Sequence, residues 1–461
     1  MTAHRFDPSI LRAYDIRGIV GETLTIDDAR ALGRAFATVV RANGGTRLAL
    51  GYDGRLSSPQ LADVLADGVR RAGVDVAWIG RGPTPMLYFA VHHLGTDGGI
   101  QVTGSHNPPS HNGFKMMLGT RAFFGEDIQH VGRIAAEGDV GTGAGALAET
   151  PLHDAYVRRI LQDAAAATPR TIVWDPGHGA VGDVLRDVTA GLPGAHHLLN
   201  AEVDGTFPAH HPDPTVPANL EQLQAAVRDK GADLGIAFDG DGDRIGVVDA
   251  EGRILWGDQI LALLAEPVLR ARPGASVIAD VKASGVLFER IAELGGEPVM
   301  WKTGHSLIKA KMAETGAPLA GEMSAHLFFA DTWYGFDDAL YAAVRVLNAL
   351  DARGGSLAAF RDSLPAVVNT PEIRFDCPGE RKFAVIDEVR ARLDARGADV
   401  VAIDGVRVNT ADGWWLLRAS NTQDVLVARC EARDQAGLDR LKDLLRAELT
   451  ASGVDTPDAF A

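Results

Sequence analysis

The chain has 461 residues, of which 46% are hydrophobic, and its 61 acidic against 45 basic residues give a net charge of −16. This length exceeds what one hydrophobic core usually serves, and it predicts about three or four domains. The negative charge argues against nucleic acid or an anionic membrane as a partner, so that a small anionic substrate needs a locally basic pocket.

The compartment is indicated by what the sequence lacks. Residues 1–10 contain no apolar signal core, and no apolar stretch approaches the roughly 18 residues of a membrane-spanning helix. There are only two cysteines, Cys377 and Cys430, which excludes a disulfide framework. We therefore expect a soluble cytoplasmic protein with two buried free thiols.

Three segments share one pattern, in which an apolar strand, a charged or Gly-rich turn, an amphipathic helix and a second strand follow one another. They span residues 47–80, 171–199 and 276–304. In the first helix the apolar residues recur at the spacing of one helical face, as Leu61, Val64, Leu65 and Val69 show. Each segment has the length of a βαβ unit, and their spacing predicts three related α/β domains.

The segments between these units carry turn-forming residues. Residues 141–151 are rich in Gly and Ala, 249–258 form a turn, and 363–373 contain two prolines. Residues 400–420 then alternate as strands joined by Asp-Gly turns, followed by a strand at 424–432 and a helix at 436–449. We predict domains over 1–150, 151–253 and 254–366, and a smaller α+β domain over 367–461.

The stretch FDGDGDR, residues 238–244, follows an apolar strand and is a candidate metal site. Asp239, Asp241 and Asp243 repel one another unless a cation neutralises them, and the intervening glycines let them converge. Oxygen ligands favour a hard ion such as Mg²⁺. A calcium loop is excluded, because its sixth position is Arg244 and its twelfth is Ala250. A solvated acidic turn is the alternative.

The loop after residue 101 places Ser105 at the end of a strand, where ligands of α/β domains usually bind. Pro108 pushes Asn107 away from helical angles and stiffens the loop. A stiffly held hydroxyl, a loop of three aspartates and scattered cations suit phosphoryl transfer, which chiefly needs positioning and charge neutralisation. The chain has no Walker-type P-loop, so nucleotide use is not indicated, and Ser105 itself is a candidate phosphate donor.

Five motifs occur in order along the chain: TGSHNPPSHNGFK, FDGDGDR, KTGHS, GEMSAH and RASNT. With AYDIRG at residues 13–18, they resemble the α-D-phosphohexomutase superfamily, and within it bacterial phosphomannomutase/phosphoglucomutase. The resemblance covers essentially the whole chain. It implies an α/β fold with mixed sheets, in which three related domains and a smaller fourth one surround a central cleft. It also implies reversible interconversion of hexose 1-phosphate and hexose 6-phosphate through a bound hexose 1,6-bisphosphate.

The resemblance assigns roles to individual residues. Ser105 carries a phosphoryl group and, with Asp239, Asp241 and Asp243, binds Mg²⁺. The groups that flank it are His106, Lys115 and Arg244. His305 is the candidate general acid or base, with Lys115 as its rival. The residues expected to bind substrate are Tyr14, Arg17, Lys282, Gly304, Glu322, Ser324, His326, Arg418, Ser420, Asn421 and Thr422.

Two of the motifs bear on the substrate. Glu322 and Ser324 are expected to bind O3 and O4 of the hexose, and RASNT to hold a phosphate. Met323 favours the mannose/glucose branch over the glucosamine branch, whereas Ala325 stands where the family pattern usually has Gly, which puts the sugar preference in doubt. We further expect a monomer that acts on sugar phosphates and is activated by glucose 1,6-bisphosphate. A Mg²⁺-dependent phosphatase with an aspartyl nucleophile and a sugar-phosphate-binding regulator are the alternatives.

Overall fold

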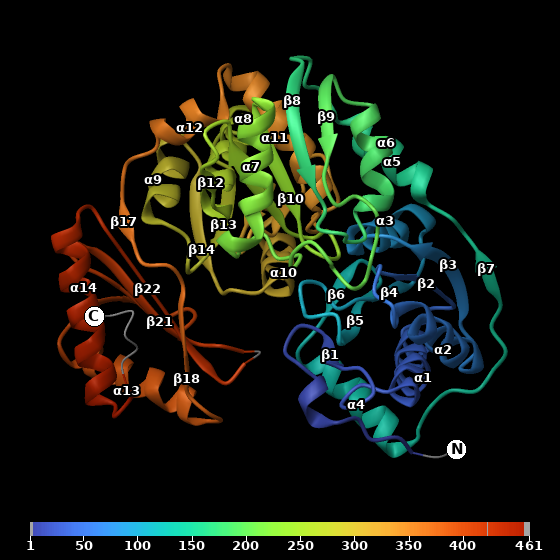
Figure 1. Cartoon of the computed structure of the whole chain (residues 1–461). Helices are drawn as coiled ribbons and strands as arrows, with labels where there is room; N and C mark the ends of the chain where they lie inside the picture. Colours follow the sequence, from blue (N-terminus) through green and yellow to red (C-terminus); the bar gives the residue numbers. More distant parts are fainter. Residues whose placement is uncertain (1–2, 422, 456–461) are drawn as a thin grey trace.

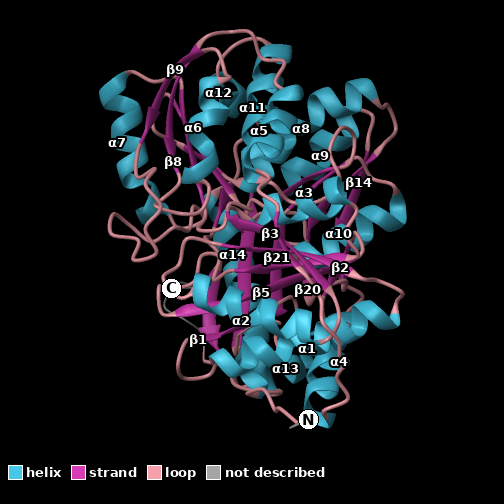
Figure 2. Ribbon diagram, turned by 90° about the vertical axis from the view of Figure 1, so that its right-hand side faces the viewer, coloured by secondary structure: helices cyan, strands magenta, loops and turns pink. Residues whose placement is uncertain are grey.

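The computed structural model describes residues 3–421 and 423–455, which form four consecutive domains, each built on its own β-sheet. The domains follow one another in an arc, from the N-terminal domain at the lower right of Figure 1 to the C-terminal domain at its lower left. Figure 2 shows helices around the strands of this arc. The predicted fold class, three α/β domains followed by a smaller α+β domain, is confirmed.

The first domain has a seven-stranded sheet in the order β1-β5-β4-β2-β3-β7, with β6 paired to β5. Its strands are β1 (Ile16–Ile19), β2 (Arg47–Tyr52), β3 (Asp75–Arg81), β4 (Gly98–Val102), β5 (His111–Leu118), β6 (Arg121–Phe123) and β7 (Leu147–Glu149). Its helices are α1 (Ile26–Ala42), α2 (Ser58–Arg71), α3 (Thr84–Leu94) and α4 (Glu126–Glu137). A capping box of Thr25 and Asp28 begins α1.

The second and third domains have sheets of five and four strands. The second contains β8 (Arg170–Asp175), β9 (Gly194–Leu198), β10 (Leu234–Phe238), β11 (Ile245–Asp249) and β12 (Ile254–Leu255), with α5 (His153–Gln162), α6 (Gly182–Ala190) and α7 (Glu221–Lys230). The third contains β13 (Ser276–Asp280), β14 (Glu297–Trp301), β15 (Leu319–Gly321) and β16 (Leu327–Phe329), with α8 (Gly257–Ala271), α9 (Gly285–Glu293), α10 (His305–Thr315), α11 (Ala339–Arg353) and α12 (Leu357–Ser363).

The fourth domain has a six-stranded antiparallel sheet in the order β17-β22-β21-β20-β19, with β18 also paired to β22. Its strands are β17 (Val368–Asn369), β18 (Ile373–Asp376), β19 (Asp399–Val401), β20 (Val406–Asn409), β21 (Gly413–Ala419) and β22 (Val425–Ala432). Its helices are α13 (Arg381–Ala395) and α14 (Gln435–Ala451). The predicted strands joined by Asp-Gly turns, and the helix after them, are all present.

The first three sheets repeat one arrangement of four strands. In the first, β2, β3 and β4 are parallel, with β2 in the middle, and β5 runs antiparallel beside β4. The sets β8, β9, β10, β11 and β13, β14, β15, β16 follow the same plan. The three predicted βαβ units are β2-α2-β3, β8-α6-β9 and β13-α9-β14. The prediction of three related domains is therefore confirmed.

One apolar core extends across the first three domains. Phe89 comes from α3 of the first domain, Trp174 from the second, and Leu263 and Tyr341 from the third. Because burial of this apolar surface stabilises all three domains together, it also fixes the relative positions of the loops at their strand ends. A smaller cluster that includes Val281 and Trp414 joins the third domain to the fourth.

The Gly-rich stretch at 141–151 is more than a linker, because it contains β7, which pairs in parallel with β3 at the edge of the first sheet. Glycines suit this position for a steric reason. A Cβ on Gly145 would stand 2.0 Å from the carbonyl oxygen of Val74, and one on Gly143 would stand 2.5 Å from Gly73 Cα. The glycines that make this stretch resemble a linker thus also allow its backbone to lie against the turn before β3.

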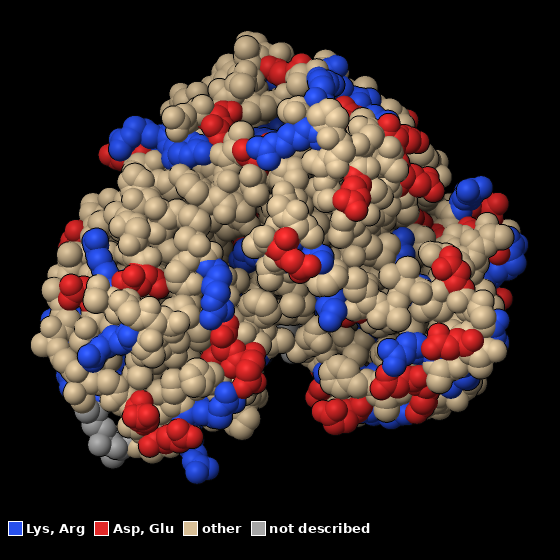
Figure 3. All heavy atoms as spheres, turned by 180° about the vertical axis from the view of Figure 1, so that it is seen from behind, with Lys and Arg blue, Asp and Glu red and all other residues tan. Residues whose placement is uncertain are grey.

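The two ends of the arc are separated at the molecular surface, where Figure 3 shows a notch between them. None of the helices within the described residues is long and apolar enough to cross a membrane. Within the same residues, Cys377 and Cys430 are both buried and free, as the sequence predicts.

Candidate active site

Three loops that occupy equivalent places in the repeated domains carry most of the predicted site residues. They join the third parallel strand to the antiparallel strand beside it: residues 103–110 after β4, 239–244 after β10 and 322–326 after β15. The carboxyl ends of parallel strands are where α/β domains bind ligands. A backbone bridge between Arg244 and His326 joins the second loop to the third.

Ser105 lies at the meeting point of the first two loops. Its buried hydroxyl donates a hydrogen bond of 2.8 Å to Asp239 Oδ2, and His106 Nδ1 lies 3.1 Å from the same hydroxyl. Its backbone has a φ of +47°, in the left-handed region that non-glycine residues seldom adopt. Such strain persists where the surroundings hold it, and it is typical of functional sites.

The three aspartates of the second loop are fully buried. Asp239 Oδ1 accepts bonds from the backbone amides of residues 242, 243 and 244, which folds the loop around this carboxylate. Asp241 Oδ2 accepts from Thr84 Oγ1 at 2.5 Å and from Lys115 Nζ at 2.8 Å. Lys115 also donates to Asp243.

Asp239 and Asp241 differ in how readily their carboxyl groups ionise. Burial, together with Asp241 and Asp243, raises the pKa of Asp239 well above its ordinary value. Burial opposes ionisation of Asp241 as well, but Lys115 and Thr84 hold the pKa of Asp241 below its usual range. Despite its burial, these carboxylates raise the pKa of Lys115 well above the ordinary value, so that the ammonium is charged.

The aspartate loop fits a cation. One oxygen from each carboxylate lies within 4.8 Å of the others. Asp241 Oδ1 and Asp243 Oδ1 are buried without a hydrogen-bond partner among the described residues. Three carboxylates face one ammonium, and unpaired buried carboxylate oxygens are strongly destabilising. This donor set of oxygens alone is the kind that a hard divalent cation prefers.

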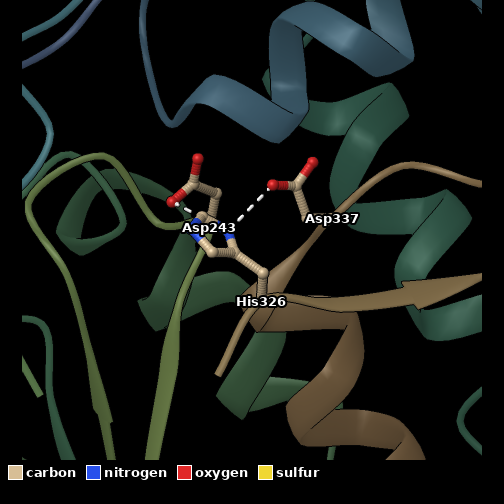
Figure 4. Close-up of side chains that lie close together, drawn as sticks. All are labelled: Asp243, His326 and Asp337. Atoms are coloured by element: carbon tan, nitrogen blue, oxygen red, sulfur yellow. Dashed lines mark ion pairs between the residues drawn. The ribbon is translucent and has the colours of Figure 1, made fainter. Parts of the chain in front are cut away.

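His326 joins the aspartate loop to the third domain. Figure 4 shows its ring between the carboxylates of Asp243 and Asp337, with Nδ1 3.6 Å from Asp243 Oδ1 and 2.9 Å from Asp337 Oδ2. Nε2 accepts a hydrogen bond of 2.9 Å from Arg244 Nε, so the proton of the neutral ring is on Nδ1. These three residues form a second group that could hold a metal ion, but Lys115 and Lys309 already pair with its two carboxylates.

Two more histidines contribute neutral rings. His305, the first residue of α10, stacks on His326 with ring centroids 5.3 Å apart, and its Nδ1 lies 3.7 Å from Asp337 Oδ2. Burial lowers the pKa of His305 well below the ordinary value, and Lys309 adds to the effect. Burial likewise lowers the pKa of His106, with smaller effects of Arg244 and Arg17.

The third loop presents Glu322 and Ser324, the residues expected to bind the sugar. Glu322 accepts hydrogen bonds from the backbone amide of Gly304 and from Ser324 Oγ, the latter at 3.1 Å. Gly304 has a φ of +136°, and a Cβ there would meet the Tyr14 ring at 2.6 Å, so only glycine fits. Ala325 has a φ of +65°, the backbone conformation that the expected Gly adopts more readily.

Tyr14 connects three domains. Its hydroxyl donates to the carbonyl of Thr303 at 2.9 Å and accepts from Asn421 Nδ2 at 2.8 Å. Burial raises the pKa of Tyr14 to about 12, so the phenol is neutral. Beside it, Arg418 Nε donates to Asp404 Oδ2 at 3.0 Å, and the same oxygen accepts from the amide of Thr303.

The remaining predicted residues lie around this framework. Arg17 donates to the carbonyl of Gly104 and to Asn107 Oδ1, both at 2.6 Å. Lys282 donates to Glu372 Oε2 at 3.0 Å, across the junction between the third and fourth domains. Ser420 Oγ accepts from the amide of Gln423 at 3.2 Å. Thr422 lies outside the described residues.

Sequence reasoning missed several residues that hold these loops: Asp53, Arg55, Thr84, Asp280 and Asp337. A repeated signal was available for two of them. A buried aspartate stands at the end of the first strand of each βαβ unit or directly after it, namely Asp53, Asp175 and Asp280. Asp53 accepts from the amide of Gly104, and Asp280 from the amide of Met323, both at 3.0 Å. The same bond thus holds the serine loop and the sugar loop.

Comparisons with known proteins agree with this architecture. The models of phosphoglucomutase/phosphomannomutase alpha/beta/alpha domains I, II and III match residues 8–139, 154–252 and 256–368, and the C-terminal domain model matches 372–448. The chain is 43% identical to a phosphomannomutase/phosphoglucomutase of Pseudomonas aeruginosa, covering 98% of both chains, and 44% identical to a phosphoglucomutase of Neisseria gonorrhoeae, covering 96% of this chain and 97% of that one.

A solved structure is similar over the whole length. The crystal structure of a phosphoglucomutase/phosphomannomutase family protein from Burkholderia thailandensis superimposes with a TM-score of 0.93 at 46% identity, covering 98% of this chain and 99% of that one. All four family domains are therefore present in their usual order, on a fold shared with a close relative. The chain belongs to the phosphoglucomutase/phosphomannomutase family.

Proposed function

We propose that this protein is a phosphohexomutase that reversibly interconverts hexose 1-phosphate and hexose 6-phosphate, with mannose, glucose or both as the sugar. Phosphorylated Ser105 gives its phosphoryl group to the free hydroxyl of a bound hexose phosphate, and a hexose 1,6-bisphosphate forms. The bisphosphate turns over within the cleft, and its other phosphate returns to Ser105. The family relationship and the polar surroundings of the Ser105 hydroxyl support this proposal.

The observation that carries the proposal is the contact between Ser105 and the aspartate loop. A hydroxyl 2.8 Å from a carboxylate that belongs to a candidate cation site stands where a transferring phosphoryl group is best neutralised. We assign Mg²⁺ to this site, held by Asp239, Asp241, Asp243 and an oxygen of the phosphorylated Ser105. When bound, Mg²⁺ withdraws charge from the phosphoryl oxygens.

Nitrogen-bearing side chains around Ser105 also contact this region. Lys115 is charged and lies against the aspartate loop, and His106 lies beside the hydroxyl. Arg244 is positioned by its bond to His326. Lys115 and Arg244 offset the charge of the phosphoryl group and the neutral His106 helps to orient it, which is most of what phosphoryl transfer asks of a protein.

Proton transfer falls to His305, with Lys115 as the rival. The pKa of His305 is lowered by burial, so the neutral ring can accept the proton of the attacking sugar hydroxyl. Lys115 cannot accept a proton, because Asp241 and Asp243 raise its pKa despite its burial and keep the ammonium charged. His305→Gln should lower kcat by about 100-fold or more if the histidine is the base.

Substrate binding is assigned to the third and fourth domains. Glu322 and Ser324 bind the sugar hydroxyls, as a carboxylate accepts two such donors well. Arg418, Ser420, Asn421 and Thr422 hold the phosphate that is not being transferred, with Tyr14, Arg17, Lys282, Gly304 and His326 completing the cleft. Because the sugar must bind in two orientations, this phosphate site has to accept either end of the bisphosphate.

A coupled assay tests the function directly. Mannose 1-phosphate, glucose 1-phosphate and glucosamine 1-phosphate are compared with Mg²⁺ and glucose 1,6-bisphosphate, which should activate the dephosphorylated protein. Turnover of the first two sugars is expected. Release of inorganic phosphate in place of isomerisation would instead support a phosphatase. We also propose a cytoplasmic monomer, for which size-exclusion chromatography with light scattering measures the oligomeric state.

A further inference from the structure

Arg55, in the turn between β2 and α2, makes an unusual set of contacts with the serine loop. The residue is almost completely buried. Its Nη2 donates to the carbonyls of Ser105 at 2.7 Å and Asn107 at 2.6 Å. Its Nη1 donates to the carbonyls of Pro108 at 2.6 Å and His111 at 3.0 Å. All four N–H groups of the two terminal nitrogens are therefore used on this loop and on the first residue of β5.

Asp53 lies beside Arg55 and accepts hydrogen bonds from the first residues of the serine loop. Its Oδ2 lies 3.3 Å from Arg55 Nε, and the same oxygen accepts from Thr103 Oγ1 at 2.8 Å and from the amide of Gly104. Its Oδ1 accepts from the amide of Arg55 and from Ser58 Oγ. The carboxylate thus fixes the start of the loop, while the guanidinium fixes its middle and its end.

Gly104 shows how closely the loop lies on the guanidinium. A Cβ added there would stand 2.2 Å from Arg55 Nε and 2.3 Å from Cζ. Arg17 also donates a hydrogen bond to the Gly104 carbonyl. The backbone before Ser105 is therefore held by two arginines, and only one of them, Arg17, is expected to line the cleft.

We propose that Arg55 is a positioning residue for phosphoryl transfer, which holds Ser105 in its left-handed conformation with the hydroxyl directed at Asp239. This inference rests on the proposed function. A residue with φ near +47° returns to an ordinary backbone conformation unless it is held, and doing so would move the hydroxyl away from the aspartate loop. Arg55 touches the loop from behind, so its effect falls on the transfer step and leaves the sugar loop alone.

The experiment compares Arg55→Met, which removes every donor, with Arg55→Lys, which keeps the charge but cannot reach four carbonyls. We expect kcat to fall about 100-fold in Arg55→Met with little change in KM, because a displacement of the order of 1 Å has this effect on rate. Arg55→Lys should be similarly impaired, and it keeps the test valid if Arg55→Met does not fold. Arg41→Met is the matched control, since Arg41 also donates to two backbone carbonyls, of Ala72 and Thr142, and should leave activity unchanged.

Chemical rescue separates positioning from general stability. Guanidinium ion at millimolar concentration should restore part of kcat to Arg55→Ala, and it should not stimulate the wild type. Hydrogen exchange of the backbone amides of residues 104–107, 110 and 111 should be faster in the Arg55 variants, whether or not mutase turnover is measured. Unchanged kcat and unchanged hydrogen exchange in Arg55→Met and Arg55→Lys would overturn the inference. Wild-type protein without mutase activity would instead refute the proposed function, while the exchange result still decides the role of Arg55.

Discussion

Ser105 Oγ and Asp239 Oδ2 lie 2.8 Å apart, although the two residues are 134 positions apart and belong to different domains. The contact exists because two equivalent loops of the repeated fold meet at their strand ends. The apolar core that joins α3 to the second and third domains keeps them there. The geometry of the candidate active site thus depends on packing between domains.

Replacing Lys115 with Met should make the protein depend on a divalent cation for its stability. Without the ammonium, Asp241 and Asp243 remain as buried carboxylates with no cationic partner at that place, which destabilises by about 3–5 kcal/mol. Thermal unfolding with EDTA and with Mg²⁺ measures this. The variant should gain more in Tm from Mg²⁺ than the wild type does. Equal gains would show that the aspartate loop does not bind the ion.

Asp337 should prove essential for rate although it is not expected to touch substrate. Its carboxylate lies 2.9 Å from His326 Nδ1, and loss of such a partner lowers activity by about 10–100-fold. We expect this loss in Asp337→Asn, with a change in the ¹⁵N NMR shift of His326 Nδ1, because the charged neighbour of that nitrogen is removed. The adjacent Asp338→Asn is the control and should keep its activity. A fully active Asp337→Asn would contradict the role given to this contact.

Asp338 should make stability depend on pH. Burial raises the pKa of Asp338 to about 7 from an unfolded value of 3.8, so the folded protein retains this proton where the unfolded chain has lost it. The stabilisation is complete below pH 4 and is lost as the pH rises through about 7. Asn resembles the protonated carboxyl and can also cap α11. Asp338→Asn should therefore unfold at a higher temperature than the wild type at pH 8.5 but not at pH 5; the same difference at both pH values would contradict this.

Ala325→Gly should stabilise the third domain. Ala325 adopts a φ of +65°, which is unfavourable for any residue with a Cβ, and the substitution should raise the unfolding free energy by about 0.5–1 kcal/mol after the greater freedom of Gly in the unfolded chain is included. Calorimetry measures the change. Ala330→Gly serves as a control for the unfolded-state effect, because Ala330 is not among the residues with positive φ. A lower Tm for Ala325→Gly would contradict the expectation.

The repeated βαβ pattern made much of the fold predictable. Apolar periodicity marked β2-α2-β3 and its two counterparts, because each unit must bury one helix face on a sheet. Ser105 and the three aspartates could be found because they stand at strand ends with unusual neighbours, a proline in one case and glycines in the other. The resemblance of the motifs then supplied the chemistry that spacing alone left open.

The supporting residues were not predictable in the same way. Arg55 acts through backbone carbonyls about 50 positions further along the chain, and Asp337 acts through the His326 ring, which only the folded chain brings beside it. Their own neighbours in sequence carry no pattern that shows this. The left-handed backbone at Ser105 and Ala325 is likewise set by surrounding structure. The aspartate at or directly after the end of the first strand of each unit is the exception, since its repetition at 53, 175 and 280 is visible in the sequence.

Mapping the phosphate on the intact protein tests the central claim most directly. After incubation with glucose 1,6-bisphosphate and Mg²⁺, mass spectrometry should find one phosphoryl group on Ser105. Excess hexose 6-phosphate should then remove it and form bisphosphate, and Ser105→Ala should neither become phosphorylated nor catalyse isomerisation. Phosphorylation of an aspartate in the 239–243 loop, or near-normal mutase turnover by Ser105→Ala, would contradict the assignment of Ser105 as the phosphoryl carrier.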